Sequence, residues 1–268
     1  MMYSLVIRLG LEEDSVLPPY QGYLVYSMFL SLVRKHHADL AVSLHTPDAV
    51  KLFSLSQIIG PMRYHDGMLY LRADDSYYIR ISILDSQSFA GVLDVFLRHG
   101  IERVRIGDVY FTVQEICTQP LAHQYAAYTS GEEIWSAASS ADTALALKFM
   151  SPTAFKSGRE SVVLPYPGLV FGSLAKKWQR CVPACPLAHL DYTRVLRIAR
   201  YDALATSMLT FKKAKQIGFT GTVWYEVRDT DERTIKSLNA LSDFAFYAGV
   251  GIKTAMGMGQ TIRLGSGH

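Results

Sequence analysis

The sequence predicts an α+β protein built from two consecutive units, each with the element order strand, helix, strand, strand, helix, strand. Its length of 268 residues suits two domains of roughly 100–150 residues, each large enough to bury a core. Strand-like and helix-like hydrophobic patterns follow one another in that order in the first 120 residues and, more loosely, in the remainder. This split order is that of the ferredoxin-like fold, which is also that of RNA-recognition modules. We place the two domains at residues 1–120 and 121–268.

The elements of the first unit begin with a half-buried strand over residues 3–9, where apolar and polar residues alternate. After two prolines, apolar residues at helical spacing predict a helix over 20–37. A short second helix is predicted to end at His45, because Pro47 disfavours helix at the residue before it. The remaining elements are strands at 51–59, 68–72 and 77–84, a helix over 88–98, and a strand over 103–117.

The second unit repeats this order without a low-complexity linker before it. We expect a strand at 143–150, a helix over 168–180, strands at 192–200, 206–213 and 219–228, a helix over 231–248 and a last strand at 258–264.

Composition excludes several classes of protein. Hydrophobic residues make up 49% of the chain and charged residues 19%, as in soluble globular proteins. No apolar stretch approaches the ~20 residues of a membrane span, and Arg8 interrupts the first apolar run too early for a signal peptide. Three cysteines are too few and odd in number for a disulfide scaffold. We therefore expect a cytoplasmic protein without a membrane partner.

Charge is distributed unevenly between the two halves. Residues 1–120 carry 10 Lys/Arg and 13 Asp/Glu, whereas residues 121–268 carry 17 and 11, a net charge of +6. A basic stretch within folded sequence is typical of a surface that follows phosphates, but a solvated basic face would have the same composition. Charge alone leaves both interpretations open.

A glycine-rich stretch precedes the last predicted strand. It contains Gly249, Gly251, Gly257 and Gly259, together with Lys253. Glycines allow backbone amides to approach an oxyanion closely, although the spacing matches neither the dinucleotide nor the phosphate-loop motif. The alternative is structural: a helix stop followed by a tight turn into the final strand.

The chain resembles a known family through pieces spread along its whole length. They are Asp39–His45 with Lys51–Ser56, Ser151–Thr153, Phe171–Leu174 with Trp178, Gly218–Gly221 and the glycine-rich stretch. In this order they are similar to the CRISPR-associated endoribonucleases that cut a precursor transcript within each repeat, part of the repeat-associated RNA-binding protein superfamily. The resemblance implies cleavage without a metal or cofactor, in which a ribose 2′-hydroxyl attacks the adjacent phosphate.

The resemblance also implies the catalytic residues. His45 and Lys51 stand where the family has its catalytic histidine and lysine, and both suit the chemistry, since imidazole transfers protons near neutral pH and lysine supplies a fixed cation. Without the resemblance, the residues favour His45 as a cap at the C-terminus of its helix. Some relatives have a tyrosine where this chain has Leu30. Tyr26, one turn earlier on the same face, is the candidate to replace it, against the alternative of a tyrosine that only packs in the core or lies at the surface.

The expected partner is a CRISPR repeat RNA, with an effector complex and a second copy of the chain as further candidates. Basic residues and the glycine-rich stretch of the second unit are the expected RNA contacts: Lys176, Lys177, Arg180, Lys212, Lys213, Lys215, Lys253 and Thr254.

Three alternatives stay open. One is a repeat-RNA-binding scaffold of the same superfamily that does not cut. A second is an RNA-binding protein of the same fold that is unrelated to CRISPR. The third is a zinc site at Cys181, Cys185 and His189, although two prolines interrupt the spacing and no fourth ligand stands out.

Overall fold

The computed structural model describes residues 1–45, 50–211 and 214–265. It divides into two compact units. The first comprises Met1–Tyr128 with Ala255–Gly257, and the second Thr129–Thr254 with Met258–His268. The chain therefore changes unit after Tyr128 and not, as expected from the sequence, after residue 120. Three residues of the glycine-rich stretch belong to the first unit.

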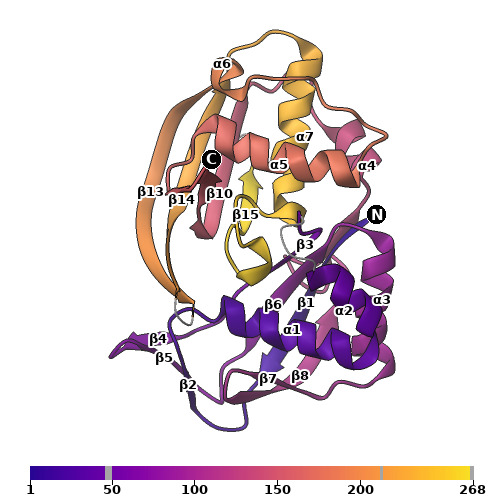
Figure 1. The fold of residues 1–268 in the computed structure, drawn as a ribbon, viewed down its shortest axis with the longest axis vertical. Coiled ribbons are helices and arrows are strands. Elements are labelled where there is room, and N and C mark those ends of the chain that lie inside the picture. The colour runs from indigo at the N-terminus through magenta and orange to yellow at the C-terminus, as the bar shows by residue number, and fades with distance from the viewer. Residues whose placement is uncertain (46–49, 212–213, 266–268) are drawn as a thin grey trace. The chain divides into compact units, whose positions relative to one another are not determined.

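Among the described residues, the first unit contains a six-stranded sheet, a three-stranded sheet and three helices. Figure 1 shows their arrangement within the unit. Its elements are β1 (Met2–Gly10), β2 (Ser15–Leu17), α1 (Gly22–His36), α2 (Ala38–His45), β3 (Phe53–Leu55), β4 (Arg63–His65), β5 (Met68–Leu71), β6 (Tyr77–Ile83), α3 (Ser86–Arg98), β7 (Arg103–Ile106), β8 (Val109–Cys117) and β9 (Ala127–Thr129). The main sheet has the order β3-β6-β1-β8-β7. Its first four strands follow the ferredoxin-like order, which confirms the predicted fold class, and β2, β4 and β5 form the small sheet.

The core of this unit lies between the main sheet and the helices. Alternate residues of β1 pair with buried isoleucines of β6, for example Leu5 with Ile81 and Ile7 with Ile79. Phe29 of α1 is fully buried against this layer. Asp85 caps α3 by accepting from the backbone N–H of Ser88 at 2.7 Å.

The opposite face of the same sheet is covered by the chain that follows β8. Ser4 donates from Oγ to the carbonyl of Tyr125 at 2.6 Å, and Arg8 donates to the carbonyl of Ala122 at 3.1 Å. Arg80, 1% exposed, donates from Nε to Ser4 Oγ at 2.7 Å. Burying an arginine is costly unless its donors are satisfied, so these contacts hold the covering segment in place. The face that RNA-recognition modules use for stacking bases is thus covered here.

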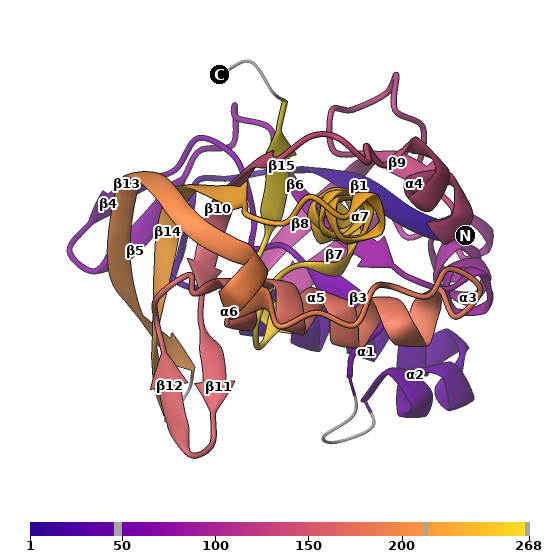
Figure 2. The ribbon, with the colours of Figure 1, turned by 90° about the horizontal axis from the view of Figure 1, so that it is seen from above.

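The second unit has the same strand order. Its elements are α4 (Gly131–Ala137), β10 (Ala144–Thr153), β11 (Phe155–Ser157), β12 (Glu160–Val162), α5 (Pro167–Cys181), α6 (Tyr192–Val195), β13 (Leu196–Phe211), β14 (Ala214–Val227), α7 (Glu232–Ala248), the 3₁₀ turn η1 (Thr254–Met256) and β15 (Thr261–Leu264). The sheet order is β13-β14-β10-β15. Helices α5 and α7 lie side by side (Figure 2). Trp178 of α5 and Phe244 of α7 make an edge-to-face contact, with ring centroids 5.3 Å apart.

Three predicted strands were wrong in extent. Residues 103–117 form two strands, β7 and β8, because Gly107 adopts φ +65° and lets a two-residue turn join Ile106 to Val109. Conversely, the strands expected at 192–200 and 206–213 are one strand, β13, preceded by the short helix α6. β13 continues because two register shifts, after Ile198 and after Asp202, absorb the residues that break its pattern.

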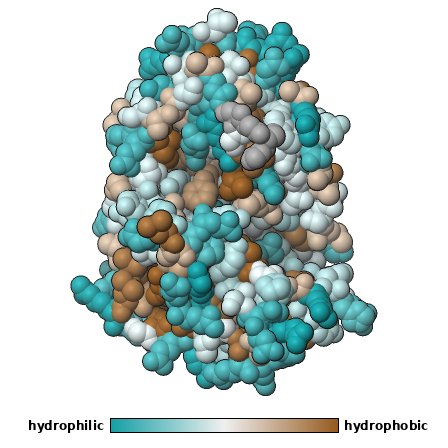
Figure 3. Space-filling model, turned by 180° about the vertical axis from the view of Figure 1, so that it is seen from behind, coloured by the Kyte–Doolittle hydropathy of each residue, from teal (hydrophilic) through white to brown (hydrophobic). Residues whose placement is uncertain are grey.

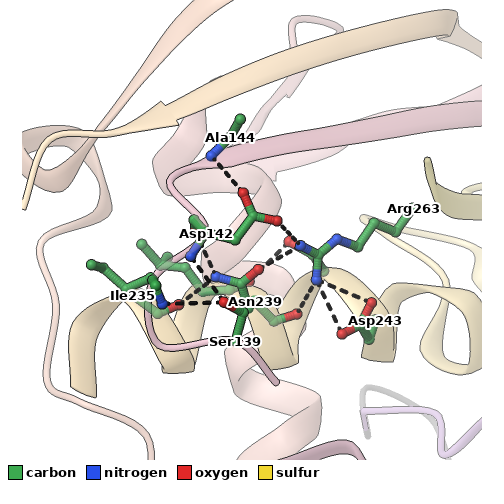
Figure 4. A network of polar contacts seen from close by, with 10 residues as sticks. Ser139, Asp142, Ala144, Ile235, Asn239, Asp243 and Arg263 are labelled. Carbon is green, nitrogen blue, oxygen red and sulfur yellow. Dashed lines mark hydrogen bonds and ion pairs between the residues drawn. The ribbon is translucent and has the colours of Figure 1, made fainter. Parts of the chain in front are cut away.

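A polar network fixes the last strand of the second unit (Figure 4). Arg263 of β15 donates to Asp243 of α7 at 3.1 Å and to Asp142, just before β10, at 3.0 Å. Asn239 of α7 donates to the carbonyl of Asp142 at 2.9 Å. Burial raises the pKa of Asp243 despite the attraction of Arg263. The network joins α7 and β15, the two elements on either side of the glycine-rich stretch, to the turn that precedes β10.

Two observations concern the surface and the membrane. On the face drawn in Figure 3, apolar side chains form separate small patches among hydrophilic ones.

Among the described residues, no helix combines the length and apolar character needed to cross a bilayer.

Candidate functional site

His45 is the last residue of α2 and is exposed. The helix begins at Ala38, directly after His37 ends α1 by donating its backbone N–H to the carbonyl of Val33 at 2.7 Å. Ala41 and Leu44, three residues apart, are the buried residues of α2 and anchor it to the core of the first unit. The imidazole is thus held at the end of a packed helix and is open to solvent.

Tyr26 of α1 contacts this histidine directly. Its hydroxyl lies 2.8 Å from His45 Nδ1, and its ring is stacked near Phe53 of β3. The tyrosine is only 9% exposed, and burial raises the pKa of its phenol, so the hydroxyl stays protonated at neutral pH. A phenol can donate to an unprotonated Nδ1 or accept from a protonated one. The contact with Tyr26 therefore holds the ring through Nδ1 in both states, and Nε2 is not part of this contact.

The side chain of Lys51 is hydrogen-bonded to the last turn of α2. Its Nζ donates to the carbonyl of Leu44, the residue before His45, at 2.9 Å. The last carbonyls of a helix lack intrahelical partners and carry partial negative charge, which favours a lysine there. Partial burial lowers the pKa of the Lys51 amine. The structure thus places Tyr26, His45 and Lys51 around the end of α2, while residues 46–49 lie outside the described part of the chain.

The neighbouring positions have other roles. Leu30 is 6% exposed and packs in the core. His36 stacks on His99 with ring centroids 3.8 Å apart, and His37 contacts Asp94 through Nε2 at 2.9 Å. Tyr26 of α1 therefore reaches His45. His36 instead contacts His99, the residue after α3, and His37 contacts Asp94 within α3.

The glycine-rich segment, residues 249–260, is a folded connection between α7 and β15. Its four glycines have φ between +63° and +85°, a region that other residues rarely adopt. A Cβ at Gly251 would lie 2.3 Å from the carbonyl oxygen of Ala154, and one at Gly259 would lie 2.0 Å from that of Val250. These glycines are required by the packing of the segment itself.

Most amides of this segment are already used. Gly251 donates to Ser173 Oγ at 3.2 Å, Ile252 to the carbonyl of Ala154 at 2.9 Å, and Gly259 to that of Pro152 at 3.1 Å. An amide that is hydrogen-bonded within the protein is not available to a phosphate oxygen. The expected anion-binding role of these amides is corrected accordingly, and the structural alternative describes the segment.

Lys177 and Thr254 are corrected as RNA contacts. Lys177 is 6% exposed and donates from Nζ to the carbonyl of Ala248 at 2.5 Å, to that of Gly249 at 3.3 Å and to Thr254 Oγ1 at 3.1 Å. Thr254 is itself 4% exposed. Both side chains are buried in the second unit because they hold the segment to α5, so neither reaches an RNA from this position.

The other basic residues predicted to contact RNA differ in exposure. Lys176 and Arg180 are exposed on one face of α5, four residues apart, and Lys215 is exposed near the start of β14. Lys253 is partly buried, with Nζ 4.0 Å from the ring centroid of Phe211 and a positive φ of +54°. Lys212 and Lys213 lie outside the described residues.

The cysteines of the alternative zinc site form no disulfide with each other, and the backbone carbonyl of Cys185 accepts from Trp178 Nε1 at 2.9 Å. Within the described part of the chain, no three His, Cys, Asp or Glu side chains are grouped so that they could hold a metal ion.

The fold and the site together define a tandem ferredoxin-like protein with a tyrosine-oriented histidine on its surface. Residues 147–261 match the family model described as CRISPR-associated endoribonuclease Cas6, and residues 1–136 match the Cas6 N-terminal domain. The chain belongs to the Cas6 family.

Individual relatives agree with this assignment. The CRISPR-associated endoribonuclease Cas6 of Mycobacterium tuberculosis (strain CDC 1551 / Oshkosh) is 36% identical over 117 residues, which cover 42% of this chain and 36% of that protein. The match thus spans about a third of that relative's length. A solved Cas6 product complex superposes with a TM-score of 0.81 at 25% identity, covering 98% of this chain and 100% of the other. Thermus thermophilus Cas6 gives 0.72 at 25% identity, with 98% of each chain covered.

Proposed function

We propose that this chain is an endoribonuclease that cuts precursor CRISPR RNA within each repeat and needs no metal to do so. The observation that carries the proposal is the contact between Tyr26 and His45 at the exposed end of α2, with Lys51 bound to the same turn. Its membership of the Cas6 family and its similarity to a Cas6 product complex support this choice of substrate.

The reaction is a transesterification followed by release. The 2′-oxygen of the ribose loses its proton and bonds to the adjacent phosphorus, while the bond from phosphorus to the 5′-oxygen breaks and that oxygen gains a proton. The products are a 2′,3′-cyclic phosphate and a 5′-hydroxyl. His45 transfers one of these protons through Nε2, and Tyr26 keeps its ring oriented. Lys51 stabilises the negative charge that develops on the phosphoryl oxygens.

Exposed basic residues of the second unit supply phosphate contacts for the repeat. Lys176, Arg180 and Lys215 can each approach the backbone, and such contacts give an affinity that falls with salt. The cytoplasmic location, the effector complex and the homodimer stay predictions.

The test is a cleavage assay on an end-labelled repeat RNA in EDTA. The proposal expects one cut, abolished by a 2′-deoxy substitution at the cut site and slowed strongly by His45→Ala. Cleavage that requires an added divalent ion would contradict the metal-independent step. Tight binding without any cut by the unaltered protein would favour the non-cleaving scaffold, and cutting that survives His45→Ala would remove His45 from the mechanism.

A further inference from the structure

The second unit contains a buried lysine whose position the proposed mechanism does not explain. Lys177 extends from α5 into a site where Nζ contacts oxygens of Ala248, Gly249 and Thr254. Two of these are carbonyls at the end of α7, which would otherwise lack helical partners. An ammonium has three N–H groups, so this arrangement offers one acceptor to each.

Lys177 has no carboxylate partner at this site in the described part of the chain. Cys181, one turn later on α5, is the ionisable group that acts on it electrostatically. On α7, Asp243 is engaged by Arg263, and in the segment Lys253 lies over the ring of Phe211. Burial lowers the pKa of Lys177 to about 7. When the amine is neutral, it can donate to the two carbonyls and accept from the hydroxyl of Thr254, so the contacts persist in both states.

The residue next to Thr254 is held in a strained conformation. Lys253 has a φ of +54°, which costs a non-glycine residue energy and persists only where the surroundings impose it. On one side Ile252 donates to Ala154, and on the other Thr254 contacts Lys177. These contacts fix the backbone at Lys253 and direct its side chain across Phe211 near the end of β13.

We propose that Lys177 is a positioning residue for RNA binding, which acts by holding the glycine-rich segment so that Lys253 presents its ammonium group to a phosphate of the repeat RNA. The inference rests on the proposed function, because it assigns a role in binding the same RNA. Lys177 itself does not touch the RNA.

The test is a double-mutant cycle on the full chain. Lys253→Ala should weaken repeat-RNA binding about tenfold and reduce the slope of log affinity against log salt by about one, as expected for one lost phosphate contact. Lys177→Met keeps an unbranched side chain of similar length but removes the amine donor. It should cause the same loss of affinity and the same reduction in salt slope. The double variant should bind no more than about twofold more weakly than Lys253→Ala, because both substitutions remove one contact.

A matched control separates positioning from general stability. Leu238→Ala, in a buried position of α7, should lower the melting temperature without changing the affinity of the folded protein or its salt slope. Additive effects of Lys177→Met and Lys253→Ala, or an unchanged salt slope in Lys177→Met, would overturn the proposal. If Lys177→Met does not fold, Thr254→Val replaces the hydroxyl that contacts Lys177 with a methyl group of similar size and should lower affinity in the same non-additive way.

Amide hydrogen exchange keeps this inference distinct from the proposed function. In free protein, Lys177→Met should accelerate exchange at Val250, Ile252 and Gly259 more than Leu238→Ala does. If the unaltered protein failed to bind repeat RNA, the proposed function and the RNA role of Lys177 would both be wrong, while accelerated exchange would still identify it as the anchor of the segment. Equal exchange in the two variants would remove the anchoring role as well.

Discussion

The two units share a strand order but keep their important polar groups in different environments. In the first unit, His45 is exposed on α2, a helix that the ferredoxin-like order does not require. In the second, Lys177 is buried and holds the glycine-rich segment, which is likewise an addition, placed between the last helix and the last strand. The shared sheet thus provides the frame, and the insertions determine which groups meet solvent. Each of the following measurements tests that contrast.

The largest expected effect is on the exposed site. His45→Ala should slow cleavage by about 10²–10⁴-fold, because it removes a proton-transfer group from the reaction. Single-turnover cleavage of repeat RNA measures the rate. His65→Ala, which alters an exposed histidine of the same unit, should cut at the normal rate; an equal loss in both variants would contradict a specific role for His45.

The buried lysine should make stability depend on pH. An unfolded lysine has a pKa near 10.5, and burial lowers that of Lys177 to about 7. Between these values the unfolded chain binds more protons, so stability should rise with pH across the window, by on the order of 4 kcal/mol in total. Urea denaturation from pH 7 to 10 should show this rise relative to Lys177→Met. Parallel pH profiles for the two proteins would refute it.

The glycine-rich segment should tolerate substitution poorly. Gly251→Ala adds a Cβ 2.3 Å from a carbonyl oxygen and should destabilise the protein by roughly 3 kcal/mol or more. Gly158 also has a positive φ, but no atom lies within 4 Å of its Cβ position. Gly158→Ala should therefore cost only about 1–2 kcal/mol. Chemical denaturation of both variants isolates the contribution of the close contact. Similar losses of unfolding free energy in the two variants would show that the positive φ alone causes the destabilisation.

Tyr26→Phe should have a moderate effect on the first site. It removes the hydroxyl that orients His45 and should slow cleavage about tenfold, with a changed pH profile and little loss of stability. Tyr64→Phe, at an exposed tyrosine of β4, provides the control. An unchanged pH–rate profile in Tyr26→Phe would mean that the contact does not affect proton transfer by His45.

The smallest effect is expected at one exposed lysine of the second unit. Lys176→Ala should weaken RNA binding only a few-fold and reduce the salt slope by about 0.9, since it removes a single solvated phosphate contact. Binding titrations at several salt concentrations measure both quantities. A slope equal to that of the unaltered protein would exclude Lys176 from the RNA-binding surface.

The sequence predicted the order of the elements because their hydrophobic periods are strong. It was less successful where a turn or bulge interrupts a pattern. Gly107 and Asp108 form the turn between β7 and β8, but the apolar residues on both sides made the region resemble one strand. In β13 the opposite happened, because two register shifts keep the strand paired although Asp202 and Ala203 break its alternation.

The site could be predicted only in part. The family resemblance made His45 and Lys51 the candidates, but spacing alone could not show that Tyr26 reaches from α1 to the end of α2. The charge of Lys177 predicts an exposed RNA contact, like its neighbour Lys176. Its position did contain a signal, since it follows Val170 and Leu174 on the stripe that α5 buries. Charge is a weaker guide to exposure than helical position when the lysine can reach helix-terminal carbonyls.

Ala255–Gly257 belong to the first unit, which affects how the two units can be expressed as separate fragments. Ala255 packs in the core of that unit, and Tyr20 donates its hydroxyl to the carbonyl of Met256. An expression fragment ending at Tyr128 would therefore lack part of its own interior. Supplied together, fragments cut between the two units should reassociate to recover it, whereas the first fragment alone should be prone to proteolysis.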